Sequence, residues 1–234
     1  MSATIDVRRA RQRFVTELPG IVSRHSLSFG AHYDPANISF GLLLAHNEDV
    51  ISAGHGFTAH PHRDLEIVTW VLAGELLHSD DQGHTALITP GTAQRVSAGR
   101  GIVHAERSSP AGPVHLVQMW VRPQDAGQPP GYAQRDLTAE LVRGGLVPVA
   151  SGRGHDALAI GQRDAVLWAA RLAPGERLTL PEAPWVHLFV ATGQLDLEQA
   201  GALAAGDAVR LSAAGGAAVV AKEPAEILVW EMHR

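Results

Sequence analysis

Two short clusters of polar residues could place metal ligands side by side in this 234-residue chain. His60-Pro61-His62 forms the first cluster and His104-Ala105-Glu106 the second. In each cluster one residue separates the two polar residues, and residues i and i+2 of a β-strand point to the same face. Two adjacent strands could therefore direct three imidazoles and one carboxylate into a single pocket. Such a ligand set, with open coordination positions, suits a catalytic non-haem Fe(II) or a neighbouring first-row metal.

The abundance of histidine has to be weighed against this interpretation. The chain contains 13 His, so accidental His-x-His pairs are expected, and a single pair is more often a surface feature or a satisfied core group. Here, however, turn-forming residues stand around both clusters: Gly54 and Gly74 bracket the first, and Pro90-Gly91 precedes the second. We therefore predict short strands at both clusters and a metal site formed by their four polar residues.

The elements that must carry these residues are mostly strands. The chain has 24 Gly and 14 Pro, which separate short apolar runs throughout. Only Arg135–Arg143 looks helical, and Gln124–Gln134 looks like a loop. Many short strands with closely spaced turns predict an all-β sandwich or barrel. The runs of strand length are Phe40–Ala45, Glu66–Leu72, Thr85–Thr89, Val114–Val121, Val166–Leu172, Val186–Ala191, Asp207–Leu211, Ala217–Ala221 and Ile227–Trp230.

A faint internal duplication divides the chain. Ala73-Gly74-Glu75-Leu76 resembles Thr192-Gly193-Gln194-Leu195, and Pro90-Gly91-Thr92-Ala93 resembles Ala205-Gly206-Asp207-Ala208. We therefore predict two similar β-barrels in tandem. An N-terminal unit would cover residues 1–125, a linker with one short helix 126–149, and a C-terminal unit 150–234.

The duplication also indicates which unit holds the metal. The positions that correspond to the first cluster hold Thr179 and Pro181, and neither can replace an imidazole. The stretch that corresponds to the second cluster lies near Val220–Glu223 and contains no His. We therefore expect the C-terminal unit to hold no metal and to pack against the first unit and shield it. His187 would be a core or surface residue.

Composition excludes several classes of protein. The net charge of −5 and the pI of about 6.2 argue against a nucleic-acid footprint. The basic run Arg8–Arg13 is short, and we expect a solvated segment there. The chain has no Cys, which excludes disulfides, thiolate metal sites and Cys nucleophiles. No apolar run approaches the roughly 18 residues that span a membrane, so we expect a cytoplasmic protein without a membrane partner.

Three segments together resemble the pirin family, a group of bicupins. They are GFTAHPHRDLEIVTWVLAGELLHSDDQG, PGTAQRVSAGRGIVHAE and PVHLVQMWV. The similarity is strong from Arg24 to Arg135 and weaker from Val149 to Glu231. It implies two cupin, or jelly-roll, barrels, of which only the first binds metal. It also implies His60, His62, His104 and Glu106 as the ligands.

The resemblance further implies a function. Some bacterial pirins act as quercetin 2,3-dioxygenases, usually with Fe(II), whereas eukaryotic relatives are iron-dependent transcriptional coregulators. The expectation is one divalent metal, Fe(II) first, with Zn, Ni, Cu, Mn or Co as alternatives. The partners would be a flavonol and O2, and the chain a monomer or weak homodimer. Glu106 would serve both as ligand and as catalytic base. A metal-binding regulatory or interaction module is the alternative.

Two departures from the family pattern are visible. Thr58 stands where Pro is common, and Trp70 stands where Tyr is usual and could border the cavity. Ordinary cupins take a carboxylate from the first motif, which here is Glu66. Because Glu66 has the same strand parity as His60 and His62, it stays a candidate for a position beside the ligands.

Other polar residues near the clusters have ordinary explanations. We expect Arg63 to form a salt bridge outside the pocket, and His78 and His84 to be solvated at either side of a turn. Phe57 could form a pocket wall but is more simply explained by packing. His115 as a hydrogen-bond partner of a ligand is a minority hypothesis.

Overall fold

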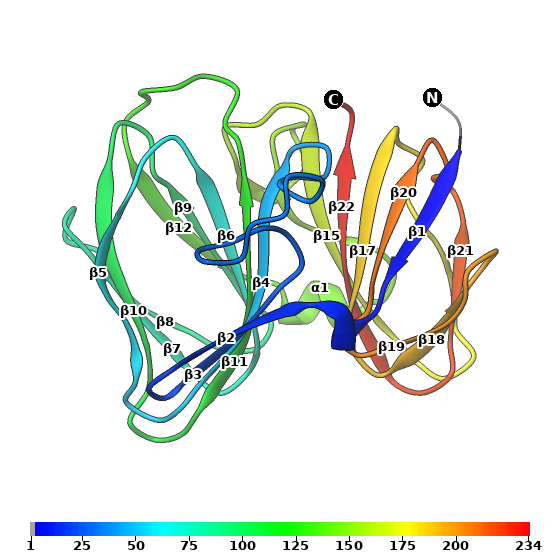
Figure 1. Cartoon of the computed structure of the whole chain (residues 1–234), viewed down its shortest axis with the longest axis horizontal. Coiled ribbons are helices and arrows are strands. Elements are labelled where there is room, and N and C mark those ends of the chain that lie inside the picture. Colours follow the sequence, from blue (N-terminus) through cyan, green and yellow to red (C-terminus); the bar gives the residue numbers. More distant parts are fainter. Residues whose placement is uncertain (1–2) are drawn as a thin grey trace.

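The computed structural model describes residues 3–234, which form two β-rich halves lying side by side (Figure 1). Each half contains a seven-stranded and a four-stranded sheet, so both are jelly-roll sandwiches of two sheets rather than single closed barrels. All neighbouring strands run antiparallel except β13 and β14. The predicted all-β class is confirmed.

The N-terminal half carries both His clusters. Its seven-stranded sheet has the order β12 (Gly131–Asp136), β9 (Thr92–Ser97), β6 (Glu66–Ala73), β11 (Val114–Val121), β4 (Leu43–Ile51), β3 (Ile21–His25) and β2 (Phe14–Leu18). Its four-stranded sheet has the order β5 (Gly56–His62), β10 (Ile102–Ser108), β7 (Leu76–Asp80) and β8 (Thr85–Ile88).

The C-terminal half repeats this arrangement. Its seven-stranded sheet has the order β1 (Thr4–Arg8), β20 (Ala208–Ser212), β17 (Trp185–Thr192), β22 (Ala225–Met232), β15 (Ala165–Leu172), β13 (Val147–Ser151) and β14 (Leu158–Ala159). Its four-stranded sheet has the order β16 (Arg177–Thr179), β21 (Ala218–Ala221), β18 (Gln194–Leu197) and β19 (Gly201–Ala204). A 3-10 turn, Ala10–Gln12, follows β1, and the helix α1, Thr138–Val142, precedes β13.

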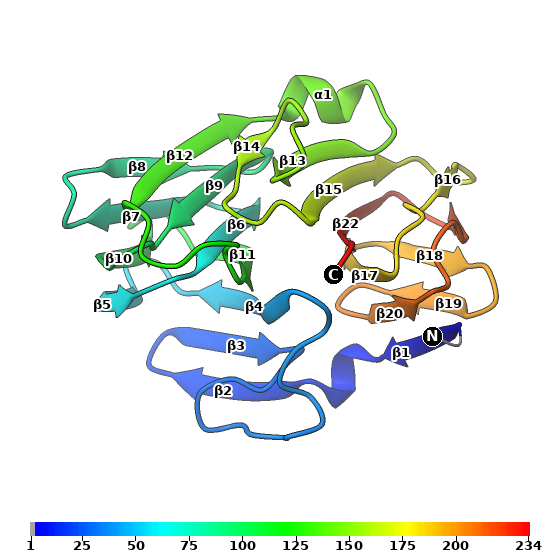
Figure 2. The same ribbon diagram turned by 90° about the horizontal axis from the view of Figure 1, so that it is seen from above.

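Sheet pairing crosses the division expected from the sequence twice. Strand β1 pairs with β20, so the first strand of the chain is an edge of the C-terminal sheet (Figure 2). Strand β12 pairs with β9 and belongs to the N-terminal sheet. The loop predicted over Gln124–Gln134 and the helix predicted over Arg135–Arg143 are therefore partly wrong. Arg135 ends up in a strand because β9 offers it an open edge, and only Thr138–Val142 stays helical.

An apolar core joins the two halves. The buried side chains of Trp70, Met119, Phe189 and Trp230 all belong to one cluster that spans both seven-stranded sheets. Trp70 is fully buried and donates from Nε1 to Glu226 Oε1 at 2.6 Å. The expectation that Trp70 borders the cavity is therefore wrong, because its strand turns this face toward the other half. The predicted packing of the two halves against each other is confirmed.

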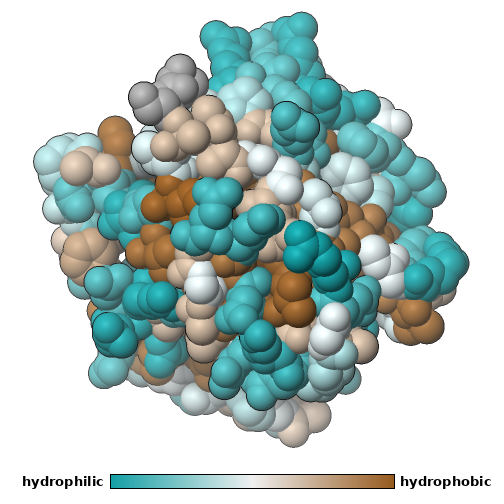
Figure 3. Space-filling model, turned by 90° about the vertical axis from the view of Figure 1, so that its right-hand side faces the viewer, coloured by the Kyte–Doolittle hydropathy of each residue, from teal (hydrophilic) through white to brown (hydrophobic). Residues whose placement is uncertain are grey.

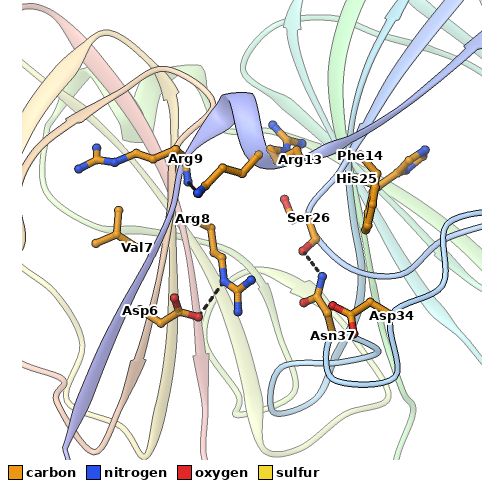
Figure 4. A pocket seen from close by; sticks show the side chains of 11 residues that line it. Asp6, Val7, Arg8, Arg9, Arg13, Phe14, His25, Ser26, Asp34 and Asn37 are labelled. Carbon is orange, nitrogen blue, oxygen red and sulfur yellow. Dashed lines mark hydrogen bonds and ion pairs between the residues drawn. The ribbon is translucent and has the colours of Figure 1, made fainter.

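The basic run also ties the halves together, which corrects the expectation of a solvated segment. Arg9 Nη1 lies 2.7 Å from Asp207 Oδ2, and Arg13 Nη1 donates to Glu48 Oε2 at 2.5 Å. The Arg13 side chain is only 2% exposed. These arginines border a cavity of about 310 Å³ between the halves, and Arg8 and Asp6, both on β1, form an ion pair in its lining (Figure 4). Opposite charges across the boundary explain why the run is ordered.

The surface of the C-terminal half mixes residue types. Hydrophilic and hydrophobic residues interleave over this face of the molecule (Figure 3). Among residues 3–234, no helix has both the length and the apolar character needed to span a membrane.

Candidate metal centre

The three predicted imidazoles meet between β5 and β10. His60 lies directly opposite His104 in the antiparallel pair, and His62 follows on the same face of β5. The ring centroids are 4.5 Å apart for His60 and His104, 4.8 Å for His60 and His62, and 5.0 Å for His62 and His104. The register shifts between His104 and Glu106, a bulge of the kind that often redirects side chains beside functional sites.

Several nitrogen atoms of this cluster lack the partners that buried polar groups normally have. His62 Nε2 and both ring nitrogens of His104 are buried without a hydrogen bond. The ligand atoms of the three residues lie within 4.8 Å of one another. His60 Nδ1 donates a hydrogen bond to the Thr58 carbonyl at 2.7 Å. The lone pair of His60 is therefore on Nε2, where it is free to bind a metal. Unpaired nitrogens facing each other are what a bound metal would satisfy, so these residues fit a metal ion.

Burial also favours the neutral form of two of the imidazoles, His62 and His104, which is the form that a metal needs. Desolvation, followed by the charges of His104 and His60, lowers the pKa of His62 to about 4. Burial likewise lowers the pKa of His104. Neutral rings have a lone pair to donate, whereas protonated rings do not.

Glu106 is held as a carboxylate by two amides that the sequence analysis did not identify. Gln94 Nε2 donates to Oε1 at 2.6 Å, and Gln118 Nε2 donates to Oε2 at 2.7 Å. Although burial opposes ionisation, the nearby His78 and His104 and the hydrogen bonds from these glutamines lower the pKa of Glu106 to about 2. The carboxylate groups with His78 and His104 rather than with His60 and His62.

The expectation that His78 is solvated is wrong. His78 is only 3% exposed, because it shares the inward face of β7 with Leu76. His78 Nδ1 lies 3.9 Å from Glu106 Oε1, and Nε2 lies 3.3 Å from Asp80 Oδ2. The ring stacks on Tyr132 with centroids 4.7 Å apart. Strand β7 extends to Asp80, so the turn begins later than its composition suggested, and only the His84 side chain, at 43% exposed, is partly solvated.

A cavity of about 290 Å³ opens beside the imidazoles. Its volume is at the lower end of the range typical of small-molecule sites, about 300 to 1,000 Å³. His60 and His62 form part of its lining, and Phe57 is indeed one of its walls. The other large apolar side chains in the lining are Leu18, Phe29 and Trp120. The Trp120 ring lies 4.9 Å from that of His62, so the aromatic part of the wall adjoins the imidazoles.

Two further candidates, Glu66 and His115, lie away from this cavity. Glu66 accepts a hydrogen bond from Ser97 at 2.6 Å and contacts Gly161, which is in the C-terminal half. Its parity with His62 is lost in the turn at Asp64, whose φ of 50° redirects the chain. His115 pairs with Glu48 at 2.8 Å, so the minority hypothesis that it partners a ligand is wrong.

The remaining expectations concern Arg63 and His187. Arg63 is exposed outside the cavity, and residues 3–234 provide no salt bridge to it, contrary to expectation. His187 is 1% exposed and packs against His46 with ring centroids 4.8 Å apart. It is therefore a core residue at the junction of the halves, as one of the two predicted alternatives stated.

Comparison with known proteins identifies the family. The profile of the Pirin family matches residues 5–121, and that of the quercetinase C-terminal cupin domain matches residues 148–232. The chain belongs to the pirin family. A Mycobacterium tuberculosis pirin relative named "Putative quercetin 2,3-dioxygenase" is 52% identical over 100% of this chain and 97% of its own length. A quercetin 2,3-dioxygenase of Escherichia coli is 40% identical over 58% of this chain and 59% of its own.

A solved pirin structure has the same fold. The bacterial pirin YhhW of Escherichia coli, in complex with nickel(II), superposes with a TM-score of 0.90 and 30% identity. The match covers 98% of this chain and 99% of that one. The bicupin architecture expected from the resemblance is therefore confirmed over nearly the whole chain.

Proposed function

We propose that this pirin is a metal-dependent dioxygenase that cleaves quercetin-like flavonols with O2. The observation that carries the proposal is the meeting of three imidazoles beside a small, largely apolar cavity. His60 and His62 form part of the cavity wall, and His62 and His104 have buried nitrogens without a partner. The names of the Mycobacterium and Escherichia coli relatives support it. A cavity of this kind favours an enzyme over the regulatory module, which would need a partner surface instead.

The ligands in this proposal are His60, His62, His104 and Glu106. When bound, a divalent transition metal, Fe(II) first, would supply the site at which flavonol and O2 meet. The protein residues would orient the substrate. Phe29, Phe57 and Trp120 line the cavity, and their apolar rings would pack against the faces of a flat aromatic substrate.

Glu106 would also handle the substrate proton. A flavonol hydroxyl has to lose its proton before its ring can donate electron density to O2, and a base within hydrogen-bond reach is needed. The imidazoles are occupied as neutral donors, which leaves the Glu106 carboxylate to accept the proton. The hydrogen bonds from Gln94 and Gln118 hold this carboxylate in place and keep its pKa low. Proton transfer therefore requires those contacts to loosen as the substrate arrives.

Oxygen uptake tests the proposal. The protein is loaded anaerobically with Fe(II), mixed with quercetin and exposed to O2, and uptake is followed together with the loss of flavonol absorbance. We expect one O2 per flavonol consumed in the wild type and near-complete loss of both metal and uptake in His62→Ala. In Glu106→Gln loaded with excess Fe(II), the three imidazoles should hold much of the metal at reduced affinity, with little uptake. The Glu106→Gln substitution brings a new amide N–H group to this position. The Gln94 amide can rotate to accept a hydrogen bond from it, because Gln94 Oε1 has no partner of its own. Stoichiometric metal without flavonol-dependent uptake in the wild type would favour the regulatory module.

A further inference from the structure

One buried carboxylate in the cavity wall has an oxygen without a partner. Asp49 is 4% exposed and lines the same cavity as His60 and His62. Its Oδ1 is buried and accepts no hydrogen bond. Burying an unpaired carboxylate oxygen is costly, so its presence in a binding cavity calls for a donor that arrives with a ligand.

The neighbouring polar groups of the wall already satisfy one another. Thr16 Oγ1 lies 2.8 Å from His25 Nε2, and His25 Nδ1 lies 2.9 Å from Asn47 Oδ1. Gln118 is committed to Glu106 and accepts a hydrogen bond from Trp120 Nε1 at 3.1 Å. Asp49 therefore differs from these neighbours in having an oxygen free to accept a hydrogen bond from a bound molecule.

The position of Asp49 separates it from the proposed metal ligands. It belongs to β4 of the seven-stranded sheet, between Ser23 of β3 and Leu116 of β11. The imidazoles come from β5 and β10 of the four-stranded sheet. A molecule in the cavity would therefore face the imidazoles on one wall and Asp49 on another. Burial raises the pKa of Asp49 to about 6, against the opposing effect of Ser23, which agrees with an unsatisfied environment.

We propose that Asp49 determines substrate specificity by accepting a hydrogen bond from a phenolic hydroxyl group of the aromatic substrate. This hydroxyl is additional to the oxygen atoms that would face the imidazoles. The preferred ligand class is thus polyhydroxylated flavonols rather than flavonols with a single hydroxyl. The inference rests on the proposed function for the identity of the aromatic ligand, but its test measures binding and not turnover.

The test compares quercetin with 3-hydroxyflavone. Both carry the same 3-hydroxyl and 4-carbonyl pair, and only quercetin has further hydroxyl groups. The Kd of each for metal-loaded protein is measured without O2, from the shift in flavonol absorbance. A hydrogen bond to a charged acceptor is strong enough to change Kd by about tenfold or more. We expect wild-type protein to prefer quercetin by at least this factor.

Two substitutions at Asp49 assign that preference to its carboxylate. Asp49→Leu removes both carboxylate oxygens and keeps the branched shape of the side chain, and should abolish the preference. Asp49→Asn keeps the size without the charge and should lower the preference severalfold. Glu66→Gln is the matched control, because Glu66 is equally buried but outside the cavity and already paired with Ser97. It should leave the preference unchanged.

The outcomes separate this inference from the proposed function. Equal binding of the two flavonols to wild-type protein, or an undiminished preference in Asp49→Leu, overturns the role of Asp49 even if flavonols are turned over. An Asp49-dependent preference upholds the inference even if Fe(II)-loaded protein consumes no O2, in which case only the dioxygenase proposal fails.

Discussion

Replacing Gln118 by Met should weaken metal binding without removing any proposed ligand. Gln118 Nε2 donates to Glu106 Oε2 at 2.7 Å, and both residues are buried. Methionine has a similar volume but no amide donor, so the carboxylate would lose one of the contacts that hold it. A hydrogen bond to a charged group contributes about 1.5–3 kcal/mol. The metal-free protein also loses this contact, so only its orienting effect on the ligand changes the metal Kd, which should rise about 10- to 100-fold, as is typical for hydrogen-bond partners of metal ligands.

The assay is competition between the protein and a chromophoric chelator for Ni(II) or Zn(II). Gln162→Met is the matched control, because Gln162 is equally buried and donates to the Arg122 carbonyl at 2.8 Å, away from the imidazoles. It should lose stability but keep its metal affinity. If Gln118→Met is folded and binds metal as tightly as Gln162→Met does, then the Glu106 carboxylate does not contribute to metal binding in the way proposed.

Two further predictions concern stability. Burial lowers the pKa of His187 to about 3, whereas an unfolded His titrates near 6.5. Between about pH 6.5 and pH 3, His187 is therefore protonated in the unfolded chain but not in the folded chain. The free energy of unfolding consequently decreases as the pH is lowered through this range. Between pH 7 and 5, the pH dependence of the free energy of unfolding in urea should be shallower in His187→Gln by about 1 kcal/mol per pH unit on average, approaching about 1.4 at the lower end; an identical slope would contradict the assignment. Trp70→Phe should cost about 1–3 kcal/mol because Glu226 loses a buried donor, and an unchanged urea midpoint would show that this contact does not stabilise the junction.

The sequence predicted the imidazole cluster because its information is local. His60 and His62 are two residues apart on one strand, and this spacing alone directs both rings to one face. That His104 would face them required only that the two strands be neighbours. The apolar runs likewise predicted most strands, because side-chain alternation and turn residues determine where a strand starts and ends.

The residues that support the site were not predictable in this way. Gln94, Gln118 and Asp49 lie on β9, β11 and β4, and only the pairing of distant strands brings them around the cavity. Nothing in their local sequence distinguishes them from other polar residues on strands. Glu66 was misplaced because strand parity does not continue through a turn. Asp64 has a positive φ, and the next strand begins with the opposite face inward.

Edge strands were the other source of error. Sequence order suggested two units that follow one another, yet β1 pairs with β20 and β12 with β9. An edge strand has free backbone groups that accept any segment of suitable length. Local composition therefore says little about which sheet an edge strand joins. The position of β1 on the C-terminal sheet was not predicted, and the arginines that follow it were for that reason expected in solvent.

Anomalous scattering from crystals of metal-loaded protein tests the central claim most directly. Data collected at the absorption edge of the bound metal should show one strong peak in each chain. It should lie within bonding distance, about 2.0–2.1 Å for imidazole nitrogen, of His60, His62 and His104. A peak beside His78 and His104 but remote from His60 and His62, or one at His187, would contradict the account.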